Sequence, residues 1–208
     1  MGGAMGEFDL IARYFTRPPV PGSAVAVGVG DDCAVLQPAP GMQLAVSSDM
    51  LVQGRHFFAD VDPRSLGHKA LAVNLSDLAA CGAEPLGFTL ALALPEANPA
   101  WLEPFAHGLL ALADAHGCQL VGGDTTAGPL NICITVFGQV PRGQALLRSG
   151  AQVGDDIWVS GTLGDARLAL EALQGHITLP ADVLAAARLR LEQPTPRVAL
   201  GQALRGVA

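Results

Sequence analysis

Apolar positions along the chain follow two periods, and the changes between them divide the sequence into predicted elements. Residues 6–15, "GEFDLIARYF", repeat their apolar side chains at helical spacing, so Phe8, Ile11, Ala12 and Phe15 are predicted to share one face. Residues 60–85 carry a helix with Asp62 as N-cap, Pro63 at its first position and Gly82 as its stop. Strands are predicted in residues 23–30, 33–38, 43–49, 86–95, 118–126 and 130–140, and a further helix in 99–117.

The pattern changes after residue 141, where a polar, glycine-rich stretch begins. The segment "IWVSG", residues 157–161, is predicted as a short strand, and the following residues up to Ala208 are mostly helical. The alternation of strands and helices indicates an α/β or α+β fold. We expect a leader in residues 1–4, a first domain in 5–141, a hinge in 142–154, and the start of a truncated second α/β domain in 155–208.

Composition narrows the class of protein. The apolar runs are interrupted by Gly, Pro and Asp before they reach membrane-spanning length, and no secretory signal pattern is present. A formal net charge of −7 argues against nucleic acid as a main partner. Cys33, Cys81, Cys118 and Cys133 form no CxxC pair, so we expect buried, reduced thiols in a cytoplasmic protein.

Acidic residues recur where apolar elements turn or end. Asp31 and Asp32 follow "VAVGVG", Asp49 follows "LAVSS", and Asp124 follows "QLVGG". Three strand ends that carry carboxylates are typical of a ligand site at one edge of a sheet. The alternative for each is a simple turn, since Asp and Gly favour turns. We adopt that alternative for the second "GDD", residues 154–156, which follows a polar segment.

Asp77 lies in a predicted helix that is apolar nearly all round, so we expect it to be buried near Asn74, which lies three residues earlier. A buried carboxylate requires hydrogen bonds or a cation. Both a metal ligand and a structural hydrogen bond remain open. Ser47 and Ser48 place hydroxyls beside Asp49, a donor set that suits Mg²⁺.

The chain lacks the P-loop, a common lysine-containing motif for binding phosphate. Lys69 is the only lysine among the 12 basic residues, and the chain has no GxxxxGK[ST] motif. Oxygen-rich clusters with almost no lysine favour several Mg²⁺ ions that bridge a polyphosphate. Neither His56 nor Arg148 stands out by pattern, since a lone histidine is more often structural and Arg148 lies in the polar hinge.

Six segments, taken in their order along the chain, resemble one protein family. They are "GEFDLIARYF", "GVGDDCAVL", "SSDMLVQGRHF", "HKALAVNLSDLAACGAEP", "VGGDTTAGPL" and "LLRSGAQVGDDIWVSGTLGDA", and together they resemble the thiamine-monophosphate kinases. The resemblance implies transfer of the ATP γ-phosphate to thiamine phosphate. It also implies the fold shared with aminoimidazole ribonucleotide and selenophosphate synthetases, in which N-terminal domains pair into a β-barrel across a homodimer.

The resemblance assigns roles by position. Those implied for Mg²⁺ are Asp31, Asp32, Ser47, Ser48, Asp49, Asp77 and Asp124. Gly123, Asp124 and Arg148 would bind ATP, and His56 would bind thiamine phosphate. Ser48 is a mild departure because the family often has Thr there. The implied mechanism is direct in-line transfer without a covalent nucleophile.

The chain stops at "LRGVA", before an acidic "SDG"-type motif of the family's second domain. One alternative is therefore a dimerising Mg²⁺- and ATP-binding module without turnover. Another enzyme of the same superfamily is the other alternative. A selenophosphate synthetase would carry a reactive Cys or Sec with a Lys near its N-terminus, and no such pair precedes Asp31.

Overall fold

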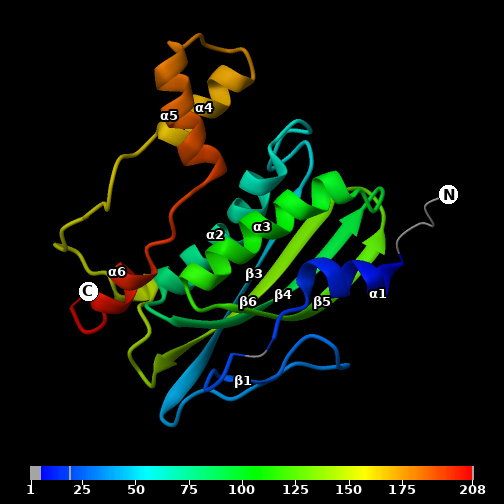
Figure 1. Ribbon diagram of the computed structural model, residues 1–208. Coiled ribbons are helices and arrows are strands. Elements are labelled where there is room, and N and C mark those ends of the chain that lie inside the picture. The colour runs from blue at the N-terminus through cyan, green and yellow to red at the C-terminus, as the bar shows by residue number, and fades with distance from the viewer. Residues whose placement is uncertain (1–5, 19, 208) are drawn as a thin grey trace.

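The computed structural model describes residues 6–18 and 20–207 (Figure 1). The leader expected in residues 1–4 lies outside this part of the chain. The helices are α1 (Glu7–Leu10), α2 (Pro63–Ala80), α3 (Pro99–Ala115), α4 (Asp165–Leu173), α5 (Ala181–Glu192) and α6 (Val198–Ala203), with a π-helical turn η1 (Ile11–Phe15) and a 3₁₀ turn η2 (Arg148–Gly150). The strands are β1 (Val25–Val27), β2 (Val35–Leu36), β3 (Met42–Val52), β4 (Glu84–Leu94), β5 (Gln119–Ala127) and β6 (Asn131–Pro141).

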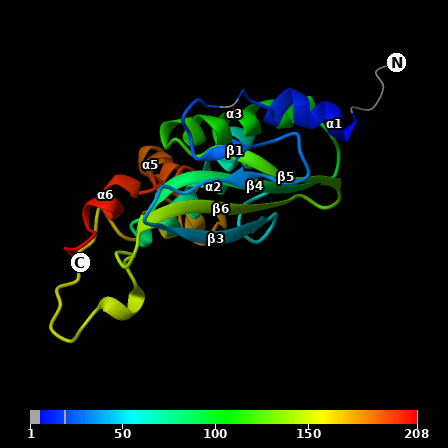
Figure 2. The same ribbon diagram turned by 90° about the horizontal axis from the view of Figure 1, so that it is seen from below.

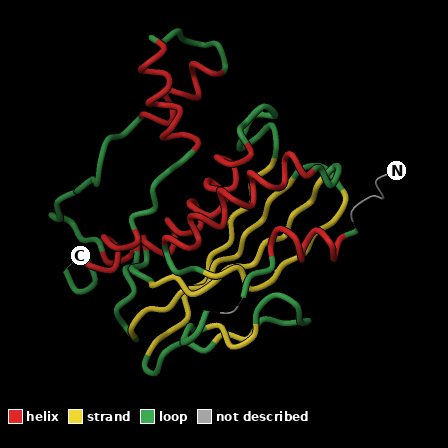
Figure 3. Tube along the Cα trace, in the orientation of Figure 1, coloured by secondary structure: helices red, strands yellow, loops and turns green. Residues whose placement is uncertain are grey.

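A mixed four-stranded sheet forms the centre of the fold, in the order β3-β6-β4-β5 (Figure 3). β4 runs parallel to β5 and antiparallel to β6, and β3 runs antiparallel to β6. The mixed α/β class is therefore confirmed. β3 and β5 are the two edge strands, although the segments that form them lie on either side of β4 in the sequence.

Two helices cover one face of this sheet (Figures 1 and 2). α2 begins where expected, because Oδ2 of Asp62 accepts hydrogen bonds from the main-chain N–H of Ser65 at 2.9 Å and from its hydroxyl at 2.8 Å. α2 and α3 approach each other through glycine. A Cβ atom on Gly108 would lie 1.9 Å from the carbonyl oxygen of Arg64, and one on Gly67 would lie 2.1 Å from that of Phe105. Only glycine permits this separation.

The other face of the sheet is open. Side chains alternate along β3, so Ser47, Asp49 and Leu51 face the helices while Leu44, Val46 and Met50 face away. Those three apolar side chains are 49%, 56% and 52% exposed, respectively. We call Leu44, Val46 and Met50 the open-face stripe.

The N-terminal segment lies beside α3 and the edge strand β5 (Figure 2). Its helix is confirmed, but the expected face is wrong in part. Leu10, Tyr14 and Phe15 are buried, whereas Phe8 is 84% exposed. The chain changes from an α-helical to a π-helical turn at Ile11, which rotates the later side chains relative to Phe8.

The C-terminal part is helical, as expected, but the strand predicted in residues 157–161 is wrong. Ile157 and Trp158 are irregular in backbone and 96% and 88% exposed, because the described residues offer them no strand partner. α4 and α5 pack together beyond the ends of α2 and α3 (Figure 1). α6 packs against α2, where a Cβ on Gly201 would lie 2.0 Å from the carbonyl oxygen of Ala79.

All four cysteines are free, but they are not equally buried. Cys118 is buried and Cys33 is exposed, so the expectation of buried thiols is wrong for Cys33. Burial raises the pKa of the Cys118 thiol to about 12, because desolvation disfavours the thiolate.

Candidate functional site

A cavity of about 570 Å³ lies between the N-terminal helix, the loop after β1 and the edge strand β5. Asp31, Asp32 and Asp124 line it, together with Gly123. Phe8, Ile11 and Phe15 form an apolar wall on the side of α1 and η1. The structure thus brings the first "GDD" and the "GGD" segments to one place, as expected from the sequence. We call this cavity the β5 pocket.

The loop that carries the two adjacent aspartates is a tight turn. Gly30 has a φ of +117°, a conformation that L side chains rarely adopt. The Asp31 carboxylate accepts a hydrogen bond of 2.8 Å from the main-chain N–H of Asp32. Both side chains are exposed. The turn alternative therefore accounts for the conformation of the loop, while both carboxylates remain accessible in the β5 pocket.

Gly123 is required by the sheet itself. β5 continues through "VGGDTT" to Ala127, so the alternative of a simple turn at Asp124 is wrong. A Cβ on Gly123 would lie 1.9 Å from the carbonyl oxygen of Leu90 on β4. Asp124, the next residue, is paired with Ala91 and is exposed. The strand pairing therefore fixes the position from which the Asp124 carboxylate enters the β5 pocket.

A second acidic group lies at the other edge of the sheet, between β3 and α2. The Ser47 hydroxyl donates a hydrogen bond of 2.5 Å to Oδ2 of Asp77. The main-chain N–H of Asp49 donates to Oδ1 of Asn74 at 3.1 Å, and Nδ2 of Asn74 donates to the carbonyl of Ala70 at 2.9 Å. Asn74 is buried, but Asp77 is exposed, so the expectation that Asp77 is buried is wrong.

Ser48 does not join this second group. It faces the open side of the sheet, where its hydroxyl lies 3.0 Å from that of Thr135 and donates to the carbonyl of Ile134 at 3.2 Å. Asp49 does not end a strand either, because β3 extends to Val52. Strand alternation therefore separates the "SSD" residues, with Ser47 and Asp49 on one face and Ser48 on the other.

The two acidic groups are separated by the width of the sheet. Asp49 pairs with Ile134 of β6, which pairs with Leu90 of β4, which pairs with Gly123 of β5. Three strand spacings amount to roughly 14 Å. Within residues 6–18 and 20–207, no group of three or more His, Cys, Asp or Glu side chains is close enough to hold one metal ion. The acidic residues expected at one edge of the sheet are therefore divided between its two edges in the described part of the chain.

The remaining predicted residues lie elsewhere. His56 is exposed in the loop after β3 and lines a smaller cavity of about 120 Å³ together with residues of α5. Arg148 is exposed in η2, beyond the end of β6, and does not line the β5 pocket. The strand register shows how far the end of β6 lies from Asp124. Cys133 of β6 pairs with Ala91, which also pairs with Asp124, and β6 ends eight residues after Cys133 at Pro141, roughly 27 Å along the strand.

Two residues that were not among the predicted site residues lie at these sites. Glu7 lines the β5 pocket from the first turn of α1, and Lys69 lines the smaller cavity beside His56. A glutamate in a short amphipathic helix carries no signal of its own. Lys69 did carry one, since it is the only lysine of the chain.

Among the described residues, no helix is both long and apolar enough to span a membrane. Comparison with known proteins identifies the kind of domain. Thiamine-monophosphate kinase of Escherichia coli strain K12 is 50% identical over 209 residues, which cover 99% of this chain and 63% of the relative. The chain thus spans less than two thirds of the length of this curated relative.

Solved structures agree with the sequence comparison. The thiamine-monophosphate kinase of Stenotrophomonas maltophilia K279a is 53% identical with a TM-score of 0.82, over 89% of this chain and 60% of that one. The structure of AaThiL complexed with AMPPCP and TMP is 30% identical with a TM-score of 0.74, over 81% of this chain and 54% of that one. Residues 30–140 match the N-terminal domain of the AIR synthase related proteins. The β5 pocket and the sheet that carries it are therefore parts of such a domain, and the chain belongs to the AIR synthase related protein family.

Proposed function

We propose that this chain provides the ATP-binding part of an enzyme that phosphorylates thiamine phosphate to thiamine diphosphate. The observation that carries the proposal is the β5 pocket, which Asp31, Asp32 and Asp124 line together with Gly123. The similar AaThiL was solved with AMPPCP, an ATP analogue, and TMP. The four free thiols agree with a cytoplasmic location.

Mg²⁺ fits these residues as a metal that is shared with the nucleotide. The absence of a three-carboxylate group among the described residues argues against a preformed cage. However, Mg²⁺ is usually held by one or two carboxylates together with phosphate oxygens and water. Asp31, Asp32 and Asp124 would hold it in the β5 pocket, and Ser47, Asp49 and Asp77 at the other edge. Bound there, Mg²⁺ would neutralise phosphate charge in a chain with one lysine.

The chain's own residues then bind and orient the reactants. Gly123 allows β5 to pair closely with β4 beside the place where the nucleotide would lie. Arg148 and His56 would contact ATP phosphate and thiamine phosphate, respectively. Among the described residues, no histidine nitrogen is hydrogen-bonded to a serine or cysteine side chain. The proposed mechanism is in-line transfer directly between the two substrates, without a covalent nucleophile.

A homodimer accounts for the open face of the sheet. The open-face stripe would be covered by the same surface of a second copy, in the manner of the barrel that the family resemblance implies. A dimer would also allow acidic groups from opposite edges of two sheets to face each other.

Analytical ultracentrifugation of Val46→Asp tests the dimer. The charge should produce a monomer, because burying an unpaired carboxylate is unfavourable. Val153→Asp is the control, since Val153 is fully exposed and lies outside the sheet. A Val46→Asp chain that still sediments as a dimer would place the interface elsewhere.

The second candidate is a dimerising module that binds Mg²⁺ and ATP without turnover. It is favoured by the separation of the two acidic groups, which lie at opposite edge strands of the described sheet. Thiamine diphosphate formation should be measured for the 208-residue chain and for a version extended at its C-terminus. Product from both supports the kinase in this chain, and product only from the longer version supports the module. Product from neither, with ATP bound, favours another enzyme of the superfamily.

A further inference from the structure

The loop that carries His56 is closed by its own main chain. The N–H groups of Arg55 and His56 both donate to the carbonyl of Val52, at 3.1 and 2.9 Å, and Gly54 donates to the carbonyl of Phe57 at 2.9 Å. Gly54 has a φ of +77°, which this tight turn requires. Phe57 is buried and anchors the end of the loop. Main-chain hydrogen bonds and the buried side chain of Phe57 therefore hold residues 53–58, which we call the His56 loop.

The His56 ring has a defined hydrogen-bonding state. Its Nδ1 atom accepts a hydrogen bond of 3.0 Å from the main-chain N–H of Val52. A nitrogen that accepts carries no proton, so the neutral ring has its proton on Nε2. Within the described residues, Nε2 of His56 has no hydrogen-bond partner. The loop thus offers one N–H donor to a ligand oxygen or nitrogen.

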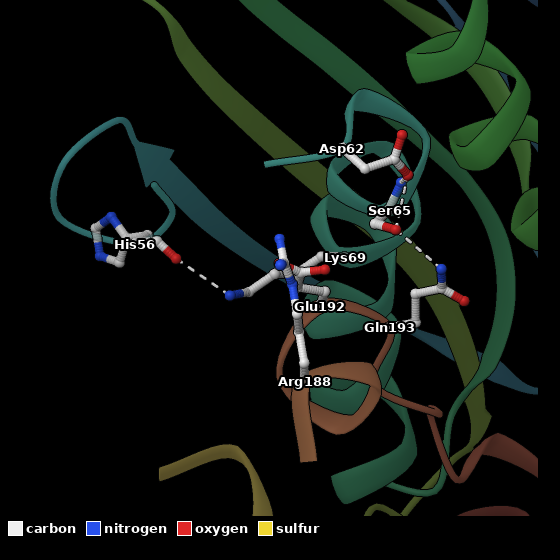
Figure 4. Close-up of polar contacts among 7 residues, drawn as sticks. All are labelled: His56, Asp62, Ser65, Lys69, Arg188, Glu192 and Gln193. Carbon is white, nitrogen blue, oxygen red and sulfur yellow. Dashed lines mark hydrogen bonds and ion pairs between the residues drawn. The ribbon is translucent and has the colours of Figure 1, made fainter. Parts of the chain in front are cut away.

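Lys69, which lies outside the His56 loop, contacts its main chain (Figure 4). From α2, its Nζ donates a hydrogen bond of 3.1 Å to the main-chain carbonyl of His56. The main-chain N–H, the carbonyl and Nδ1 of His56 are then all partnered, and Nε2 is the polar atom that remains. The aliphatic stem of Lys69 is partly buried, which restricts the position of the ammonium group.

Helix α5 supplies a negative charge near this ammonium group. Glu192 lines the same small cavity as Lys69 and His56, and Figure 4 shows it beside Lys69. Burial lowers the pKa of Lys69, and the carboxylate of Glu192 opposes that effect by favouring the charged form. Arg188 pairs with the same carboxylate, with 2.8 Å between its Nε and Oε1 of Glu192. Gln193 fixes the end of α5 through a hydrogen bond of 2.9 Å to the Ser65 hydroxyl.

We propose that Lys69 is a positioning residue, which holds the His56 loop so that the imidazole presents Nε2–H to the substrate as a neutral donor. The proposal rests on the proposed function for the identity of that substrate, thiamine phosphate. The tautomer of the His56 ring does not depend on the proposed function. The hydrogen bond from the Lys69 ammonium group to the carbonyl of His56 restricts rotation of the peptide unit between His56 and Phe57, next to the Cα atom that carries the imidazole. It thereby maintains the hydrogen bond from Val52 to Nδ1.

Nitrogen NMR of the histidine side chains tests this directly in the 208-residue chain. The wild-type spectrum should show a single Nε2–H tautomer for His56, which is assigned by its loss in His56→Gln. Lys69→Met keeps the stem but removes the donor, so a mixture of both tautomers is expected. Lys69→Arg retains a cationic donor and should restore the single tautomer. Arg188→Met is the control, because it removes the other cation beside Glu192 without touching the loop.

An unchanged His56 tautomer in Lys69→Met, in a chain with its wild-type circular dichroism, would overturn the proposal. Should Lys69→Met fail to fold, Lys69→Leu gives the same decision, since leucine is apolar and has no side-chain donor. In a C-terminally extended chain that turns over, Lys69→Met should raise KM for thiamine phosphate by about three- to tenfold, with kcat little changed, as expected for one hydrogen bond. An extended chain without activity would count against the proposed function and leave the tautomer result decisive for Lys69.

Discussion

The hydroxyl of Ser47 donates to Oδ2 of Asp77, and this one contact joins the edge strand β3 to helix α2. It uses one carboxylate oxygen of Asp77 and leaves the exposed side of the group free. Asp77 therefore makes a structural hydrogen bond and also remains accessible, so the two alternatives of a metal ligand and a structural hydrogen bond do not exclude each other.

Replacement of Asp77 by Asn should abolish the Mg²⁺ dependence of ATP binding, because the amide keeps an acceptor for Ser47 but removes the charge. Calorimetry of ATP binding with and without Mg²⁺ measures this. Asp155→Asn is the matched control, since Asp155 is exposed and its carboxylate accepts from the main-chain N–H of Gln152. Equal effects of the two variants would refute the distinction between these carboxylates, and ATP binding that is independent of Mg²⁺ in the wild type would refute the metal proposal.

Gly108→Ala should destabilise the fold by about 1–3 kcal/mol, because its Cβ would lie 1.9 Å from the carbonyl oxygen of Arg64 and α2 and α3 would have to separate. Thermal unfolding should show a melting temperature lower by several degrees. Gly150→Ala, with open space around its Cβ, should change little. A Gly108→Ala chain as stable as wild type would show that the two helices can move apart at low cost.

Cys118 should resist alkylation by iodoacetamide at pH 8 while Cys33 reacts, because one thiol is buried and the other exposed. Mass spectrometry of the modified peptides distinguishes them. The pKa of Cys118, raised to about 12, also makes stability depend on alkaline pH. The folded state holds the proton more tightly than the unfolded chain, so this contribution is complete below the ordinary thiol pKa and is lost as pH rises from about 9 towards 12. Rapid labelling of Cys118 in the folded chain would contradict the burial described here.

Asp62→Ala should cost about 1 kcal/mol of stability, because α2 would lose the cap that accepts two hydrogen bonds from Ser65. Burial raises the pKa of Asp62, but the hydrogen bonds from Ser65 lower it by more, so the folded pKa lies below its ordinary value. The contribution of the cap is therefore present at neutral pH and is lost as pH falls through that lowered pKa. Urea unfolding at pH 7 and pH 3 should show a smaller difference between variant and wild type at the lower pH.

Local signals predicted the helices well. The Asp-Pro start and the glycine stop of α2 are read directly from the sequence, since caps depend on neighbouring residues. The end of β3, predicted at residue 49 and found at Val52, was not predictable in this way. β3 and β5 both run through segments that favour turns, "SSD" and "GGD", because pairing with β6 and β4 outweighs local preference.

The site residues were predicted individually, but their grouping was not. Asp31, Asp32 and Asp124 do meet in one pocket. Asp49 and Asp77 do not join them, because the sheet order β3-β6-β4-β5 places the third and fifth strands at opposite edges. That order depends on contacts between distant segments, and no spacing in the sequence reports it.

The placement of acidic residues on two edge strands has an electrostatic consequence for a chain of net charge −7. A separation of roughly 14 Å exceeds the Debye length of about 8 Å at physiological ionic strength, so exposed carboxylates of the two groups scarcely repel each other. The folded chain can therefore collect this charge without the self-repulsion of one dense cluster. Coulombic attraction that draws the groups together arises only when a cation is supplied from outside.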